Sequence, residues 1–204
     1  MTATEGILQL SFNRQLLFFG GDLAVSSMTI MLSMNQILQL PMEGIAQGTQ
    51  PIISYNFGAK KYDRVKKAIS LAMKVSLIYS IIGVLSMEFF PEMFVNLFAN
   101  DPQLVTLAST MLKVYIFGFI IMGANSTYQQ TYTSLGFGKR AFFFAFYRKI
   151  ILLIPLIYIL PHFISDGVFA VMLAEPLSDL ITTITNTFAF RSFMHKHLNY
   201  HDAT

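Results

Sequence analysis

The sequence contains no cysteine and few charged residues. Without cysteine, the chain cannot form disulfides or thiolate metal sites. Charged residues make up 12% and hydrophobic residues 54% of its 204 residues, whereas a soluble domain has about 25% charged residues. Its 20 Phe and 12 Met suit a lipid-facing surface and an adaptable interior. The composition therefore indicates a membrane protein.

Other absences exclude further classes. The chain has no G-x-x-x-x-G-K-[ST] motif, so it does not hydrolyse ATP by a P-loop. No Ser/His/Asp or histidine–carboxylate arrangement indicates catalysis. We expect His195, His197 and His201 to lie in a solvated tail rather than to bind a metal. The basic residues follow the loops, which predicts topology rather than nucleic-acid binding. We therefore expect no enzyme, no cofactor and no metal site.

Long apolar segments predict an all-α, polytopic integral membrane protein. Residues 1–194 are expected to form one six-helix bundle, followed by a polar cytoplasmic tail at 195–204. The first span reaches only about 21 Å at about 1.5 Å per residue, so we expect it to be truncated, with part of it preceding Met1. The six predicted spans cover approximately 6–19, 23–55, 66–89, 103–133, 141–161 and 167–190.

The connectors between these spans alternate in charge. Those at 20–22, 88–102 and 161–167 carry Asp or Glu and no Lys or Arg. Those at 56–67 and 136–140, and the tail, are basic. Because basic connectors stay in the cytoplasm, this pattern predicts a multi-pass protein of the cell membrane with both termini cytoplasmic.

A stripe of amides and one acid follows the second span. At about 100° per residue the stripe covers an arc of about 80°, and such a stripe cannot face lipid. It is therefore expected to line a wet cavity. Contact with another helix is the alternative, which Gly44-x-x-x-Gly48 also fits. The stripe consists of Gln36, Gln39, Glu43, Gln47, Gln50 and Ser54.

The sixth span carries a second polar stripe over about 100° of arc. Glu175 and Asp179 share a face, so their charges repel unless one binds a proton or a cation bridges them. Pro176 is expected to kink the helix beside them. These acids are candidate ion carriers, or they bond structurally to the backbone that Pro176 frees. The stripe consists of Glu175, Ser178, Asp179, Thr182 and Asn186.

The fourth span has a polar edge of Asn125, Gln129 and Tyr132. These residues are expected to line the same cavity or to bridge helices. The segment Arg140–Lys149 has basic ends around an aromatic block, which is typical of an anchor at the inner membrane interface.

The segment GIAQGTQPIISYNFGAKKYDRV, together with Leu135-Gly136-x-Gly138-Lys139 and Glu175-Pro176-x-x-Asp179, resembles the MATE family of multidrug and toxin extrusion transporters. The matches follow the family's order along nearly the whole chain. We expect Pro51 to loosen the helix end and Gly58 to permit a tight reversal. The motif positions are Gly44, Gln47, Gly48, Pro51, Tyr55, Asn56, Gly58, Ala59 and Arg64.

The resemblance implies two six-helix bundles around a central cleft, which exports cationic or amphipathic compounds in exchange for Na⁺ or H⁺. This chain resembles the second bundle, so its implied partners are the lipid bilayer, such substrates and a complementary N-terminal half. Many members carry coupling acids on the first and fourth helices of this bundle. Here the first span has only Glu5 and the fourth has none, which leaves Glu43, Glu175 and Asp179 as candidates.

Three other functions remain open from the sequence. A lipid-linked oligosaccharide flippase of related fold would need cations for pyrophosphate, for which the spans offer Arg14 and Lys113. A membrane subunit of an ATP-driven complex would need a separate ATPase. A purely structural scaffold would tolerate leucine at the polar stripes.

Overall fold

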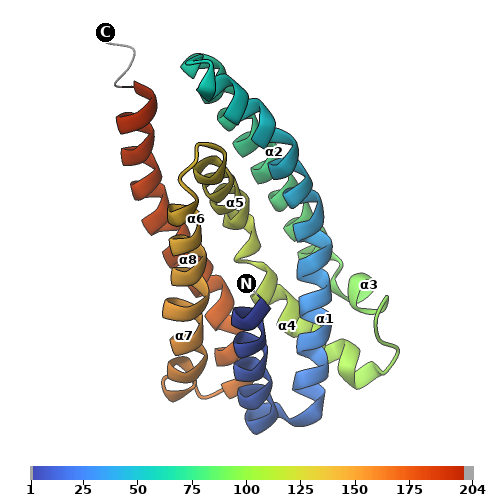
Figure 1. The fold of residues 1–204 in the computed structure, drawn as a ribbon. Coiled ribbons are helices and arrows are strands. Elements are labelled where there is room, and N and C mark those ends of the chain that lie inside the picture. Colours follow the sequence, from blue (N-terminus) through green and yellow to red (C-terminus); the bar gives the residue numbers. More distant parts are fainter. Residues whose placement is uncertain (1, 200–204) are drawn as a thin grey trace.

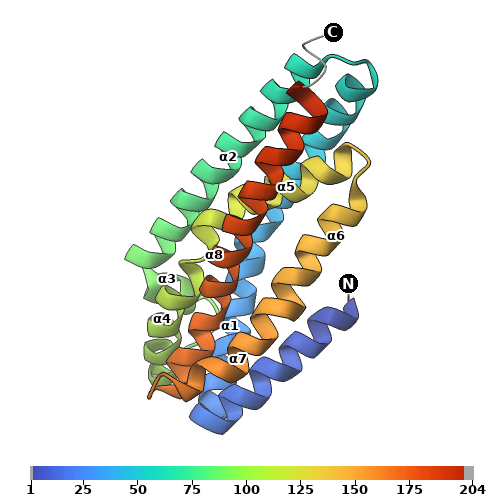
Figure 2. The ribbon, with the colours of Figure 1, turned by 90° about the vertical axis from the view of Figure 1, so that its left-hand side faces the viewer.

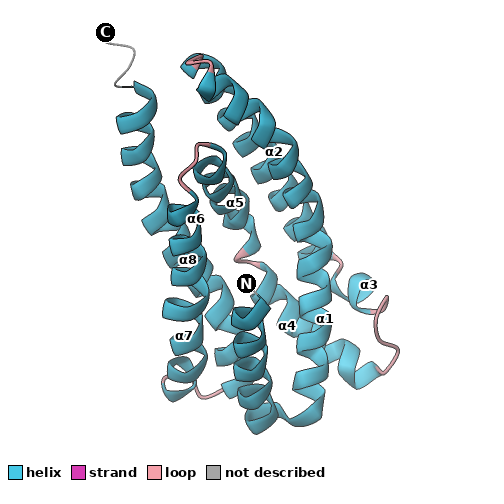
Figure 3. Cartoon of the chain, viewed as in Figure 1, coloured by secondary structure: helices cyan, strands magenta, loops and turns pink. Residues whose placement is uncertain are grey.

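The computed structural model describes residues 2–199, which fold into helices joined by short loops, with no strand in that range (Figure 3). The first six helices are α1 Thr2–Gly58, α2 Tyr62–Phe89, α3 Pro91–Val95, α4 Pro102–Ile116, α5 Phe119–Ser134 and α6 Gly138–Phe146. They are followed by the π-helix η1 Tyr147–Leu153, α7 Ile154–Ile159, the 3₁₀ turn η2 Leu160–His162, α8 Gly167–Met194 and the π-turn η3 His195–Asn199.

The long helix α1 is folded back on itself at Gly21. This residue has φ 63° and ψ −160°, a conformation that only glycine adopts without strain. Figures 1 and 2 show the segment before Gly21 running antiparallel to the segment after it. The predicted boundary between the first two spans therefore coincides with a true reversal of the chain.

Four helices are long and apolar enough to cross a membrane, namely Thr4–Gly58, Tyr62–Phe89, Gly138–His162 and Gly167–Leu198. A further pair, α4 and α5, passes the same test together and is bent by 46°. Because α1 contains the reversal at Gly21, these elements provide the segments from which six crossings were predicted. The number of crossings stays a prediction.

The predicted fourth span, over 103–133, is not one straight helix, because the chain breaks between α4 and α5. The backbone amide of Ile121 bonds to the carbonyl of Gly118, three residues back, at 3.3 Å. From α2, the Ser80 hydroxyl donates to the Ile120 carbonyl at 3.0 Å. A side chain of α2 thus bonds to the backbone of the first turn of α5, next to the break.

The two last predicted spans also differ in detail. The fifth contains the π-helix η1 just before Pro155. Pro155 has no N–H to offer the Ile151 carbonyl, so the regular α-helical bond is missing there. The sixth continues through Pro176 as one helix to Met194. The predicted tail at 195–204 begins with the helical turn η3, and residues 200–204 lie outside the described range.

The acidic and basic connectors lie at opposite ends of the bundle. The reversal at Gly21 and the loop before α8 lie at the lower end in Figure 1. The basic turn after α1 and the C-terminal end of α8 lie at the upper end. This separation agrees with the charge pattern from which the topology was predicted. Which end faces the cytoplasm stays a prediction.

Two apolar clusters form the core and leave a polar layer between them. One cluster includes Met31, Leu112 and Val171. The other is aromatic and includes Tyr132, Phe190 and Phe193. Along the C-terminal helices, Val171, Met172 and Ala174 belong to the first cluster and Phe190, Phe193 and Leu198 to the second. The buried polar residues of α8 lie between these stretches and form the middle layer of the bundle.

The loop before α8 ends in a helix cap. The Asp166 carboxylate accepts a bond from the Phe169 amide at 3.0 Å. We expect Asp166→Ala to lower the free energy of unfolding by about 1 kcal/mol, because a cap acceptor is lost. Asp166→Asn keeps an equally good acceptor and should cost much less. Thermal unfolding of both purified variants measures the difference, and equal losses would contradict the capping role.

Candidate functional site

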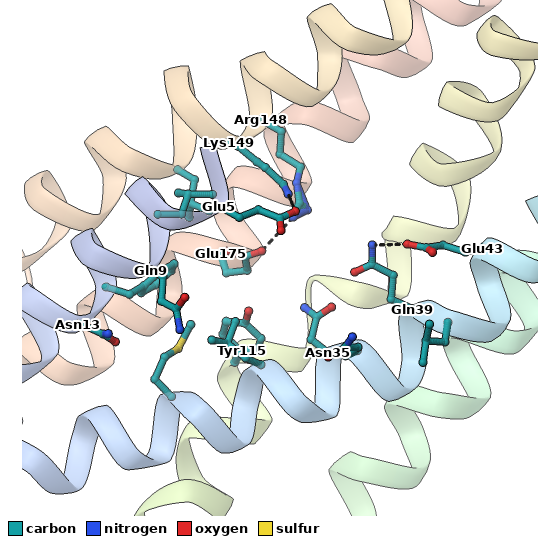
Figure 4. A pocket seen from close by; sticks show the side chains of 17 residues that line it. Glu5, Gln9, Asn13, Asn35, Gln39, Glu43, Tyr115, Arg148, Lys149 and Glu175 are labelled. Carbon is teal, nitrogen blue, oxygen red and sulfur yellow. Dashed lines mark hydrogen bonds and ion pairs between the residues drawn. The ribbon is translucent and has the colours of Figure 1, made fainter. Parts of the chain in front are cut away.

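The polar stripe of α1 faces two adjoining pockets. The first has a volume of about 520 Å³ and is lined by Gln36, Gln39 and Glu43 of this stripe. The second, of about 750 Å³, is lined by Gln39, Glu43 and Gln47. The Gln39 amide donates to the Glu43 carboxylate at 3.0 Å (Figure 4). Of the six residues of the stripe, Gln36, Gln39, Glu43 and Gln47 thus line these two pockets.

The opposite wall combines the start of α1 with η1. Lys149 donates to the Glu5 carboxylate at 2.9 Å, which ties the first segment of α1 to the fifth span. Figure 4 shows these side chains and that of Arg148 gathered across the pocket from Gln39 and Glu43. The two pockets share five polar or charged residues, which are Glu5, Gln39, Glu43, Arg148 and Lys149.

Below this wall, Arg148 joins the two acids of α8. Its guanidinium donates to Glu175 at 3.1 Å and to Asp179 at 2.5 Å. The three residues are 7%, 6% and 5% exposed, respectively. The Ser178 hydroxyl also donates to the Arg148 carbonyl at 2.9 Å. The cation that the paired acids require is therefore a side chain of the same bundle, and Glu175 alone of the two acids lines a pocket.

Sequence reasoning missed the role of Arg148. It placed the residue in an anchor at the membrane interface, and the structure corrects this because Arg148 is buried and bonded to both acids. A signal was present, since two acids one turn apart in a span repel unless one binds a proton or a cation bridges them. The sequence did not show that η1 directs Arg148 toward α8.

A buried network connects α5 with α8. Asn186 donates from its amide to Asn125 at 2.7 Å, and the Tyr132 hydroxyl donates to Asn186 at 3.3 Å. Thr182 is fully buried, and its hydroxyl has no partner among the described residues. Tyr132, Thr182 and Asn186 lie inside the bundle rather than on either pocket wall. Their predicted cavity-lining position therefore does not match this arrangement, because α5 and α8 pack against each other there.

Of the remaining predicted residues, two line the second pocket and one lies outside both pockets. Asn125 and Gln129 line the second pocket. Gln50 lines neither pocket but accepts a bond from Gln130 at 3.0 Å, which links α1 to α5. Within residues 2–199, no group of three or more His, Cys, Asp or Glu side chains could hold a metal ion.

The family-motif residues lie on the second half of α1 and in the turn after it. A side chain added at Gly44 or Gly48 would touch nothing within 4 Å, so these glycines are not a packing face inside this bundle. The tight reversal occurs at Lys60, which has φ 56°, rather than at Gly58, where α1 ends. The remaining motif positions are Gln47, Pro51, Tyr55 and Asn56 in α1, Ala59 in the turn and Arg64 in α2.

Solved structures share this fold. A MATE crystal structure in the bent conformation superposes with a TM-score of 0.91 at 16% identity and covers 100% of this chain and 44% of that one. An outward-facing multidrug resistance MATE transporter of the MOP superfamily gives a TM-score of 0.88 at 15% identity, covering 95% and 44%. The chain therefore has the MATE fold over somewhat less than half of such a protein.

Sequence comparison gives the same family. Multidrug export protein MepA of Staphylococcus haemolyticus is 25% identical over 86% of this chain and 38% of its own length. MepA of Staphylococcus aureus strain MSSA476 is 26% identical over 88% and 40%. The chain thus spans about two fifths of these relatives. The family model described as MatE matches residues 4–159. The chain therefore belongs to the MatE family of transporters, the multidrug and toxin extrusion proteins.

Proposed function

We propose that this chain is the C-terminal lobe of an ion-coupled multidrug exporter and works together with a complementary N-terminal lobe. Its curated relatives are described as multidrug export proteins and are more than twice as long as the matched region. Solved transporters of this fold are described in outward-facing and inward-facing conformations. Alternating access of that kind needs two bundles that move against each other.

The observation that carries the proposal is the pair of adjoining pockets with acids on both walls. The charged residues that line them or lie directly behind them are Glu5, Glu43, Glu175 and Asp179 against Arg148 and Lys149. Acids outnumber bases, so the site favours a cation. Phe142 and Phe146 add aromatic surface to the second pocket. An amphipathic cation matches this combination of charge and apolar surface.

Among the three candidate acids, Glu43 is the one free to act on substrate or coupling ion. Glu175 and Asp179 are both bonded to Arg148. Glu43 is exposed to both pockets, and in the described part of the chain its carboxylate bonds only to the Gln39 amide. We assign to Glu43 the exchange between a cationic substrate and the Na⁺ or H⁺ that drives export.

A flippase for pyrophosphate-linked lipids is less consistent with this site. Such a pocket needs cations that are free to bind phosphate. The two cations that line these pockets, Arg148 and Lys149, both pair with acids. Arg14 and Lys113 are exposed residues that line neither pocket.

The first test is dye binding by the purified chain in lipid nanodiscs. We expect Glu43→Gln to weaken ethidium binding about tenfold or more, because a charge-assisted contact contributes about 1.5–3 kcal/mol. Fluorescence anisotropy measures the affinity. The control is Glu92→Gln, which removes an exposed acid in α3 outside both pockets. Unchanged binding with Glu43→Gln, or an equal loss in the control, would refute the assignment.

The second test separates the lobe from the whole exporter. We expect cells that express this chain alone to show no ethidium efflux, because one lobe provides one wall of a cleft. Fusion to the N-terminal lobe of the S. aureus relative should give efflux that stops when the driving ion gradient is collapsed. Separate collapse of the Na⁺ and H⁺ gradients identifies the ion. Efflux by the chain alone would contradict the two-lobe proposal.

A further inference from the structure

The outer face of α2 changes from basic to apolar along its length. Figure 2 shows α2 along the outer edge of the bundle. At about 100° per residue, seven exposed residues between positions 64 and 82 fall within an arc of about 100°. They are Arg64, Lys67, Leu71, Lys74, Val75, Ile78 and Ile82. This face therefore carries its cations at one end and a purely apolar surface beyond them.

The basic end is densely charged. The segment 60–67 contains five Lys or Arg residues and one acid, Asp63. Within the described residues, no carboxylate forms an ion pair with Arg64, Lys67 or Lys74. The exposed side chains of this end thus present an excess of positive charge at the end of the bundle where α1 turns into α2.

The position of Lys74 indicates the level of the lipid headgroups along α2. It is exposed next to Leu71 and Val75, about 10 Å further along the helix than Lys67 at about 1.5 Å per residue. A charge left among acyl chains is costly, so the ammonium must reach a polar group. Side chains of a helix tilt toward its N-terminus, which here is the direction of Lys67. The Lys74 ammonium therefore extends along the helix toward the level of Lys67.

We propose that this face of α2 binds the phosphate of an anionic phospholipid, with Arg64, Lys67 and Lys74 around the headgroup. The acyl chains of the same lipid would pack along Ile78 and Ile82. An anionic headgroup is preferred over a zwitterionic one because the amine of the latter is repelled by the three cations. Clusters of basic residues at the end of a membrane helix recognise anionic lipids in this way.

The absence of tryptophan from the chain permits a direct test. Leu71→Trp places a single reporter between Lys67 and Lys74, and Leu85→Trp places a matched reporter on the same helix, about 21 Å away. Each variant is reconstituted in vesicles of phosphatidylcholine and phosphatidylglycerol, and one of these two lipids is brominated. We expect the quenching of the reporter at position 71 by brominated phosphatidylglycerol to correspond to a local concentration of this lipid about fivefold above its bulk concentration. At position 85 we expect quenching that corresponds to the bulk concentration.

Charge-removal variants complete the experiment. Arg64→Gln/Lys67→Gln/Lys74→Gln should abolish the enrichment, and high salt should reduce it. The matched control Arg14→Gln/Lys113→Gln/Arg191→Gln removes the same amount of charge from exposed positions elsewhere. This control should keep the enrichment of phosphatidylglycerol at position 71. Equal enrichment at both reporters, or its persistence in the α2 triple variant, would overturn the proposal. So would its loss in the control, because the effect would then follow total charge.

Discussion

Replacing Arg148 by methionine is expected to destabilise the bundle by about 3–5 kcal/mol, the largest effect of any substitution considered for this chain. The guanidinium is buried between Glu175 and Asp179 and bonds to both. Removing it leaves two carboxylates close together in a layer with no other cation bonded to them in the described part of the chain. The measurable consequences are a lower yield of folded protein and a lower temperature of unfolding in detergent.

The neighbouring residue provides a matched control. Lys149 also pairs with an acid, but Glu5 is largely exposed, with 60% of its side chain accessible. Lys149→Met should therefore cost about 1 kcal/mol or less. The neutral combination Arg148→Met/Glu175→Gln/Asp179→Asn should recover much of the loss, because uncompensated charge rather than missing packing is the cause. A triple variant no more stable than Arg148→Met would contradict this explanation.

The second large effect is expected at Gly123, where α5 crosses α2. A Cβ at this position would lie 2.7 Å from the Ser76 carbonyl oxygen and 2.9 Å from the Ser80 hydroxyl oxygen. The nearest obstacle is backbone, which cannot turn aside as a flexible side chain can. Gly123→Val should therefore force the helices apart and cost about 1–3 kcal/mol or more.

The control for this prediction is Gly48→Val, an exposed position on α1 where an added Cβ meets nothing within 4 Å. Both variants add the same side chain to a helical glycine, so intrinsic helix propensity cancels in the comparison. Thermal unfolding of the two purified proteins measures the difference. Equal stability would show that α2 and α5 are not held in close contact at Gly123.

These two glycines also show where a sequence motif misleads. Gly44-x-x-x-Gly48 has the spacing of a helix-packing motif, yet neither glycine contacts a neighbour in this bundle. Close approaches to the backbone of another helix occur instead at Gly118, against Pro176, and at Gly123, against Ser76. Spacing along one helix identifies a face, but only the arrangement of the other helices decides whether that face is covered.

The fold was largely predictable from the sequence because bilayer thickness and loop charge constrain it strongly. The all-α membrane architecture, the turn at Gly21 and the separation of acidic from basic connectors all follow from hydropathy and charge. The break between α4 and α5 did not, because the contacts beside it, such as the bond from Ser80 of α2 to the Ile120 carbonyl, come from another helix.

For the candidate site, the sequence by itself determined that the amides and acid of α1 share one face, and that Glu175 and Asp179 share another, where they need a proton or a cation. Both conclusions depend on helical periodicity, which is local. The tertiary structure decided that Arg148 is that cation, that Thr182 and Asn186 are buried between helices, and that Glu43 remains open to both pockets. These outcomes depend on which helices pack together, and contacts between residues far apart in the chain leave no periodic signal within either helix.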